Sequence, residues 1–244
     1  MAPMAGLLSL ERQEDVAIVT LQRPEKRNAL SIDLRVEIAD AFGGLGEDDG
    51  VGAIVLTGAG PAFCSGMDVT QFGGDRDNKE RLVETSLASF RAVGNCPKPV
   101  VAAVNGPALA GGFALALLCD IRHASEDASF GFPELPRGIP PSYAAVRATL
   151  PAAIAAELTL TGRMLDAATA LRLGVVAAVH EPDLLMPRAV ELAGRIASGP
   201  RQAVAETKRR ILLDRERNFG HLFAEEERLL REALVGDGPD DSAA

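Results

Sequence analysis

The chain has 244 residues, of which 47% are hydrophobic, so it can build one sizeable core and we expect one large domain. The net charge is −9 with both signs scattered, so the sequence offers no basic face to nucleic acid or to an anionic membrane. The three cysteines, Cys64, Cys96 and Cys119, lack the spacing of a disulfide framework or a zinc cluster. We therefore expect a cytoplasmic protein with no metal, secretion signal or membrane span.

Three short runs rich in β-branched residues predict strands at 16–21, 51–57 and 98–106. Nearly every residue in them is apolar, as in a sheet covered on both faces. Helical patterns fall between the runs: Ser31 is suited to cap a helix with Ile32, Val36 and Ala39 on one face. Val83, Leu87 and Phe90 mark a second helical face. Strands that alternate with helices predict an α/β fold.

Beyond about Ser142 the patterns are helical, apart from a short strand expected within 175–180. We expect an α/β core over 1–195, a C-terminal helical region over 196–236 and a frayed acidic tail over 237–244.

Gly111 and Gly112 stand between a strand with its loop and an apolar helix. Free N–H groups and the positive end of the helix dipole at such a position stabilise an anion. Close packing against a neighbouring backbone is the alternative reason for two glycines. The motif lacks the spacing of the nucleotide-binding glycine loops, so a nucleotide phosphate is disfavoured.

A second small-residue loop, 58–69, follows the strand that ends at Thr57, and it exposes the N–H groups of Gly66, Met67 and Asp68. By itself this loop could be a plain strand-to-helix turn with Asp68 as the cap. Two such loops after two strands of one sheet would lie on one rim, where α/β sheets bind ligands. Two convergent N–H groups there could hold a carbonyl oxygen as it becomes an anion.

Glu134 is the candidate acid or base, because it follows a short apolar segment and precedes a turn rich in glycine and proline. Half-buried beside Phe130, Phe132 and Leu135, its carboxyl group would have a raised pKa. The alternative is a glutamate in a surface loop. A Ser-His-Asp site is disfavoured, since the sequence has no GxSxG and its histidines have no local motif.

Several motifs, in order, resemble the enoyl-CoA hydratase/isomerase or crotonase superfamily: "RPEKRNALS" (23–31), "GPAFCSGMDV" (60–69), "PVVAAVNGPALAGGFALALLCDIRHAS" (99–125), "ASFGFPELPRGIP" (128–140) and "LTGRMLDAATALRLGVVAAV" (160–179). The resemblance implies a spiral of ββα units, C-terminal helices that mediate trimer contacts, and a CoA thioester as substrate. It implies no prosthetic group, and a homotrimer or a dimer of trimers as the assembly.

Carried to matching positions, the resemblance implies that the N–H groups of Met67 and Gly111 hold the thioester oxygen. It places contacts to the CoA moiety at Ala29, Leu30, Gly66, Asp68 and Val69.

The hydratases of this family use two glutamates, of which one matches Glu134 and the other matches Ala114. With one carboxylate the expected reaction is isomerisation of a 3-enoyl-CoA to a 2-enoyl-CoA, with Glu134 carrying the proton. One alternative is a hydratase, lyase or hydrolase that recruits another acid, for instance from 72–80. A second is a protein that only binds acyl-CoA.

The CoA 3′-phosphate needs positive charge, and the chain lacks the basic C-terminal segment of many relatives. The candidates are two groups, each of which could instead be a solvated face: Arg23, Lys26 and Arg27, or Lys208, Arg209 and Arg210.

Overall fold

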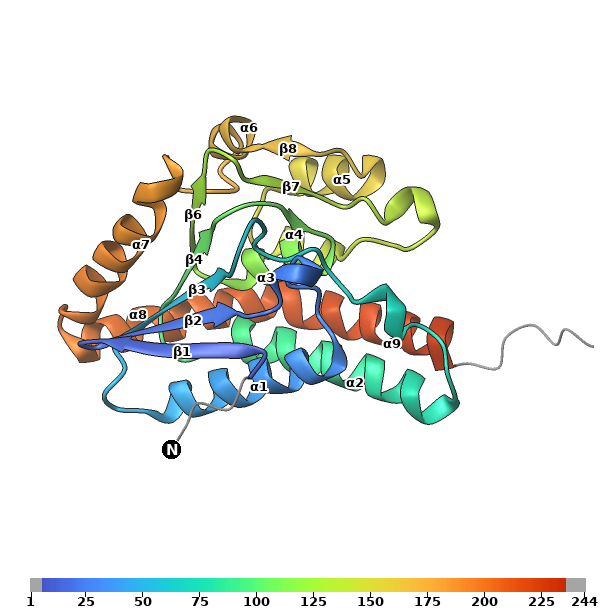
Figure 1. Cartoon of the computed structure of the whole chain (residues 1–244), viewed down its shortest axis with the longest axis horizontal. Coiled ribbons are helices and arrows are strands. Elements are labelled where there is room, and N and C mark those ends of the chain that lie inside the picture. The colour runs from blue at the N-terminus through green and yellow to red at the C-terminus, as the bar shows by residue number, and fades with distance from the viewer. Residues whose placement is uncertain (1–5, 236–244) are drawn as a thin grey trace, which may run out of the picture.

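The computed structural model describes residues 6–235, which form two sheets surrounded by helices (Figure 1). The six-stranded sheet has the order β1-β2-β3-β4-β6-β9. Its strands are β1 (Leu8–Gln13), β2 (Val16–Leu21), β3 (Ala53–Gly58), β4 (Val100–Val104), β6 (Ile121–Ser125) and β9 (Ala178–His180). The smaller sheet has the order β5-β7-β8, with β5 (Ala108–Leu109), β7 (Ser129–Gly131) and β8 (Leu165–Asp166). Only β1 with β2 and β7 with β8 pair antiparallel.

The helices are α1 (Ile32–Glu47), α2 (Arg76–Gly94), α3 (Gly111–Leu118), α4 (Tyr143–Arg147), α5 (Ala152–Thr161), α6 (Ala167–Arg172), α7 (Pro182–Ala197), α8 (Arg201–Arg215) and α9 (His221–Val235). Three short 3₁₀ turns are η1 (Pro24–Lys26), η2 (Val69–Gln71) and η3 (Leu135–Arg137), and η4 (Glu216–Gly220) is a π turn. The predicted strands and the predominantly helical second part are confirmed. The sequence analysis did not identify β1, β6 or β7.

Ser31 caps α1 as predicted, since its side chain accepts a hydrogen bond from the Leu34 N–H. The predicted apolar face of this helix is wrong at Val36, which is 40% exposed, whereas Ile32 is buried as predicted. The buried face instead carries Leu34, Ile38, Phe42 and Leu45, which recur every three or four residues.

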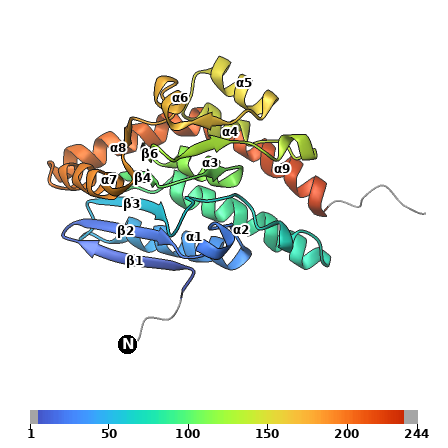
Figure 2. The same cartoon turned by 45° about the horizontal axis from the view of Figure 1, so that its top comes forward.

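The chain repeats one unit: a strand in the large sheet, a short extended segment in a second layer, and a helix. β4, β5 and α3 form one such unit, and β6, β7 and α4 form the next. Figure 2 shows the strands β4 and β6 with the helices α3 and α4 of these units. Two earlier units contain β2 with α1 and β3 with α2. Their second-layer segments are joined by isolated bridges, Leu30 with Met67 and Cys64 with Ala108. The arrangement confirms the expected spiral of ββα units.

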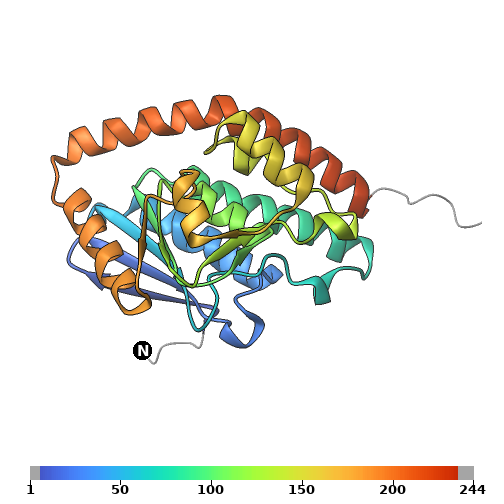
Figure 3. The same ribbon diagram turned by 90° about the horizontal axis from the view of Figure 1, so that it is seen from above.

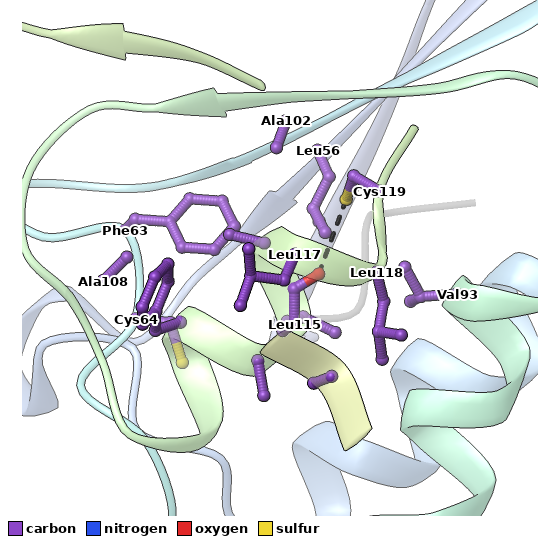
Figure 4. Packing of buried hydrophobic residues seen from close by; sticks show 14 of the residues in the cluster. Leu56, Phe63, Cys64, Val93, Ala102, Ala108, Leu115, Leu117, Leu118 and Cys119 are labelled. Carbon is purple, nitrogen blue, oxygen red and sulfur yellow. Dashed lines mark hydrogen bonds between the residues drawn. The ribbon is translucent and has the colours of Figure 1, made fainter. Parts of the chain in front are cut away.

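The central strands β2, β3 and β4 are buried on both faces of the large sheet, as their apolar residues predicted, whereas the edge strand β1 is largely exposed. Alternate residues such as Leu56 and Ala102 point into a core shared with α1, α2 and α3, part of which Figure 4 shows. Val55 and Val101 point to the opposite face, where α7 covers them.

The C-terminal helices α8 and α9 run along one side of the molecule (Figure 3). A buried ionic cluster ties α8 to the core: the Lys208 ammonium and the Arg215 guanidinium both donate to the Asp120 carboxylate, at 2.6 and 3.0 Å. The division into a core and a C-terminal region stays a prediction, as do the trimer contacts. The predicted tail at 237–244 lies outside the described residues.

Candidate functional site

Three extended segments run parallel to one another in the second layer and bring the predicted catalytic residues to one edge. Cys64 pairs with Ala108, and β5 pairs in turn with β7, where Leu109 lies opposite Gly131. Met67, Gly111 and Glu134 each follow the carboxyl end of one of these segments within a few residues. Since the carboxyl ends of parallel segments meet at one edge, the fold gathers residues that are far apart in sequence.

The two glycine loops are joined by backbone hydrogen bonds. The Leu109 N–H donates to the Cys64 carbonyl at 2.9 Å, and the Cys64 N–H donates to the Pro107 carbonyl at 3.2 Å. The position that a Cβ atom would take on Gly66 lies 3.3 Å from the nitrogen of Gly111. The second loop is therefore held against the start of α3.

The direction of the Met67 N–H is set by its neighbours. Leu30 donates to the Gly66 carbonyl at 2.8 Å and accepts from the Asp68 N–H at 3.2 Å, so the Met67 N–H between them points away from Leu30. Gly111 is the first residue of α3, where helical N–H groups lack an intrahelical acceptor. Neither N–H donates to any group within residues 6–235, so both are available to a ligand oxygen.

Gly111 and Gly112 serve different purposes. A Cβ atom on Gly112 would overlap the carbonyl oxygen of Cys64 and would lie 2.7 Å from its carbonyl carbon, so this glycine is required for packing. A Cβ on Gly111 would meet ordinary contacts, with Phe90 Cζ at 3.4 Å and Leu30 Cδ1 at 3.6 Å. The packing interpretation is confirmed for Gly112, and the anion-binding interpretation stays a prediction for Gly111, whose N–H is available.

Ala110, the residue before α3, has a φ of 50° and a ψ of −126°, a conformation unfavourable for a residue with a side chain. Its N–H donates to the Gly131 carbonyl at 2.9 Å, which fixes the turn against β7. Backbone strain of this kind persists where the surrounding structure imposes it, and it often accompanies functional sites. The strained backbone of Ala110 turns the chain so that α3 begins immediately after β5.

Glu134 precedes the short turn η3 and is partly buried. Burial raises its pKa to about 7, against smaller opposing effects of its own N–H and the Arg137 charge. Its Oε2 atom is buried and accepts no hydrogen bond from the described residues. The expectation of a half-buried carboxyl group with a raised pKa is confirmed, and a carboxyl group poised near neutrality can take up and release a proton.

The residues predicted to contact CoA lie around the Leu30–Met67 bridge. Ala29 and Leu30 are buried, and Val69 is 67% exposed. Asp68 is buried and engaged: it caps η2 and receives a hydrogen bond from Arg23 at 3.0 Å. Burial acts to raise the Asp68 pKa, but the hydrogen bonds from Thr70 and Arg23 outweigh it and the pKa is lowered.

Ala114 is 2% exposed and lies in the first turns of α3. Two of the three acids in the segment proposed to supply another acid are engaged elsewhere. Asp75 caps α2 by accepting from the Asn78 N–H, and Glu80 pairs with Arg76 at 3.1 Å. The third, Asp77, is exposed in the first turn of α2.

Of the basic residues 208–210 expected near the CoA phosphate, Lys208 is excluded, because it is 2% exposed and bound to Asp120. Arg209 and Arg210 are exposed and pair with Glu206. In the first group, Arg23 is committed to Asp68 and to the Ala29 carbonyl, whereas Lys26 and Arg27 are exposed.

Sequence reasoning missed two residues that shape the site. Asn28 is fully buried, donates to the carbonyls of Ala59 and Ala62, and accepts from the Arg23 N–H, so it fastens the first motif to the loop after β3. Phe90 was identified only as part of a helical face, yet its ring stands beside Gly111. The place of Asn28 within the first motif could have indicated it, but no local signal indicates Phe90.

The fold and the site define a class of protein: a ββα spiral in which two available backbone N–H groups and a carboxyl group follow the carboxyl ends of parallel segments in the second layer. The family model described as enoyl-CoA hydratase/isomerase matches residues 11–235. A probable enoyl-CoA hydratase of Rhizobium meliloti is 41% identical over 78% of this chain and 75% of its own length. The crystal structure of an enoyl-CoA hydratase/isomerase from Mycobacterium paratuberculosis has a TM-score of 0.88 at 29% identity, and covers 95% of both chains. A monofunctional enoyl-CoA isomerase from M. smegmatis has a TM-score of 0.72 at 33% identity, over 86% of this chain and 94% of that one.

The chain belongs to the enoyl-CoA hydratase/isomerase family. It is an enzyme of a family that acts on CoA thioesters, which argues against the alternative of a protein that only binds them. Over the part of the chain that the structure describes, no helix is long and apolar enough to cross a membrane. No group of three or more potential metal ligands occurs among those residues.

Proposed function

We propose that the enzyme isomerises 3-enoyl-CoA thioesters to 2-enoyl-CoA thioesters. Glu134 removes a proton from Cα, the N–H groups of Met67 and Gly111 hold the oxygen of the resulting dienolate, and Glu134 returns the proton at Cγ. The observation that carries the proposal is the single carboxyl group with a pKa of about 7. Ala114 stands where the resemblance places a second carboxyl group.

The chemistry of each group suits this sequence of steps. The two N–H groups gain strength as negative charge develops on the thioester oxygen, so they favour the dienolate over the ground state. A carboxylate whose pKa lies near the working pH is basic enough to take the α-proton and acidic enough to return it. Hydration would further require a water molecule to be positioned and polarised, which is the task of a second acid.

The test is Glu134→Gln, which keeps the shape of the side chain and removes its proton transfer. We expect kcat for conversion of a 3-enoyl-CoA to fall by about 100- to 10,000-fold, the usual contribution of a general acid or base. Affinity for a saturated acyl-CoA, measured by calorimetry, should be nearly unchanged. The control is Glu126→Gln, in the same stretch of chain but exposed. Unchanged turnover in the Glu134 variant would contradict the proposal.

Hydration is the second candidate, favoured because most of the curated relatives bear hydratase names. Product analysis of a 2-enoyl-CoA in ¹⁸O-labelled water distinguishes it, since only hydration places labelled oxygen at Cβ. Ala114→Glu extends the test: the added carboxyl group should raise hydration relative to isomerisation, and Ala114→Gln should not. Rapid hydration by the unchanged enzyme would favour this candidate over the first.

For the CoA moiety we propose contacts at Ala29, Leu30, Gly66, Asp68 and Val69, with Asp68 acting through the position of its loop. Lys26 and Arg27 are exposed near this motif and are the proposed partners of the 3′-phosphate. Lys26→Glu and Arg27→Glu should each weaken binding of an acyl-CoA more than binding of its 3′-dephospho form. Equal weakening of the two would exclude a role at that phosphate.

We also propose a homotrimer or a dimer of trimers. Two large apolar side chains at the end of α5 and just after it are exposed, Leu160 at 78% and Met164 at 47%. Their exposure supports burial of this surface against another subunit. Native mass spectrometry tests the assembly, and a monomer at micromolar concentration would contradict it. A reducing, cytoplasmic compartment fits the three cysteines, which are buried and free.

A further inference from the structure

One side chain outside the three motifs stands directly beside the oxyanion donors. Phe90, on α2, has its ring tip 3.4 Å from the position of a Cβ on Gly111. One helical turn earlier on α2, the Ser86 hydroxyl lies 4.0 Å from the sulfur of Met67. The same face of α2 therefore touches both residues whose N–H groups are available, and forms one wall of the site.

The Phe90 ring is supported from behind by α9. Phe223 meets it edge-on, with ring centroids 6.4 Å apart and an interplanar angle of 84°. Phe223 is itself stacked on Phe219 at 4.5 Å, and both are buried, at 6% and 2% exposure. Phe90 is only partly buried, so it is the outermost ring of this three-ring stack.

The contacts around Phe223 fix the stack in place. The Arg91 guanidinium lies 5.7 Å from the centre of the Phe223 ring and also pairs with Glu227 at 2.7 Å. On the other side of α9, Glu226 accepts hydrogen bonds from the Ser142 hydroxyl and the Ala144 N–H, at 2.7 and 2.8 Å. Since α9 is held at both places, the buried Phe223 ring is fixed against the Phe90 ring.

We infer that Phe90, supported by Phe223, limits the length of the acyl group and makes this an enzyme for short-chain thioesters. The inference rests on the proposed function, since it takes the thioester oxygen to lie on the Met67 and Gly111 N–H groups. An acyl chain attached to that carbonyl starts beside the Phe90 ring, and a longer chain directed toward α2 would meet a ring that cannot yield. Rejection by a rigid wall discriminates more strongly than the loss of one apolar contact.

The experiment compares four-carbon and ten-carbon thioesters with the unchanged enzyme and with Phe90→Leu and Phe90→Trp. We expect the unchanged enzyme to prefer the four-carbon substrate in kcat/KM. Phe90→Leu should raise the ratio of ten-carbon to four-carbon kcat/KM by about tenfold or more, and Phe90→Trp should lower it. Phe223→Leu, which frees space behind Phe90, should shift the ratio in the same direction by a smaller factor.

The matched control is Phe42→Leu, an equal loss of ring volume at a core position of α1 that is 1% exposed. It should lower stability without changing the chain-length ratio. Calorimetry with the saturated four-carbon and ten-carbon acyl-CoA gives the same comparison without any turnover. A ratio unchanged in Phe90→Leu, or a preference of the unchanged enzyme for the ten-carbon chain, would overturn the inference.

The outcomes also separate this inference from the proposed function. If Glu134→Gln abolishes isomerisation but the ratio does not respond to Phe90, the reaction is correct and the length limit is wrong. If affinity for the ten-carbon chain rises in Phe90→Leu while Glu134→Gln still isomerises, the length limit is correct and the proposed role of Glu134 is wrong.

Discussion

The two halves of the site are held in opposite ways. The donor half, with Met67 and Gly111, is fixed by backbone hydrogen bonds between three neighbouring segments, and Gly66 and Gly112 beside them are closely packed. The acid half is one side chain on a short turn, and one of its oxygens is buried without a hydrogen bond from the described residues. In the proposed reaction the first half consists of dipoles that need not change, whereas the second must change its charge.

This difference indicates what each half requires from the fold. Oxyanion donors act by being correctly oriented before the reaction, so a rigid backbone serves them best. A proton carrier needs both of its charge states to be accessible, so a site that hydrogen-bonds its carboxylate strongly would trap it as an anion. The predictions below test first the rigidity of the donor half and then the charge balance of the acid half.

The largest effect should come from packing at the donor half. Gly112→Ala places a Cβ against the carbonyl group of Cys64, and we expect it to lower the free energy of unfolding by at least about 3 kcal/mol. Gly111→Ala is the matched control, since its Cβ meets only contacts of 3.4 Å or more, and it should change stability by less than about 1 kcal/mol. Urea unfolding measures both, and equal losses would show that the two glycines are not distinct.

The next effect is the pH dependence of the rate. In the proposed reaction Glu134 acts first as a base, so kcat/KM should rise with pH and level off above about 7, the pKa of the carboxyl group. Two units below that pKa, only about one molecule in a hundred carries the carboxylate, so the rate should be about 100-fold lower. A profile flat from pH 5 to 8 would show that this carboxyl group is not the base.

A smaller effect is expected on stability. The Glu134 pKa is raised from 4.5 unfolded to about 7 folded, so the folded state binds more protons over that range and stability falls as pH rises through it. Glu134→Gln removes this penalty and should stabilise the protein relative to the unchanged enzyme above pH 7, by on the order of 1 kcal/mol, with the difference shrinking toward pH 4.5. Thermal melts at pH 5 and pH 8 measure it. A difference independent of pH would contradict this account of the raised pKa.

The smallest effect is expected at Ala110, the residue with the strained backbone that precedes Gly111. Ala110→Gly should stabilise the fold by about 1 kcal/mol or less, since glycine adopts a φ of 50° without penalty but gains freedom in the unfolded chain. A loss of stability of similar size would show that the Ala110 side chain matters more for packing than its backbone angle does.

Much of the fold follows from local patterns. The apolar runs that became β2, β3 and β4, the Ser31 cap and the C-terminal helices are each specified by neighbouring residues. β1 was missed because its residues are largely exposed and polar, and β7 because three residues are too few for a periodic signal. The face of α1 was wrong because a polar residue, Arg35, takes a buried position there.

The sequence by itself determined the alternation of strands and helices, the two glycine loops, Glu134 as the candidate acid or base and, through its motifs, the resemblance to the family, because each depends on residues that are close together in the chain. Only the tertiary structure decided that Gly112 serves packing while Gly111 presents its N–H, that Lys208 is buried on Asp120, and that Phe90 supported by Phe223 stands beside the donors. These outcomes depend on contacts between segments tens to more than a hundred residues apart. Such contacts exist only once the sheets, α2 and α9 have packed together, so no local pattern encodes them.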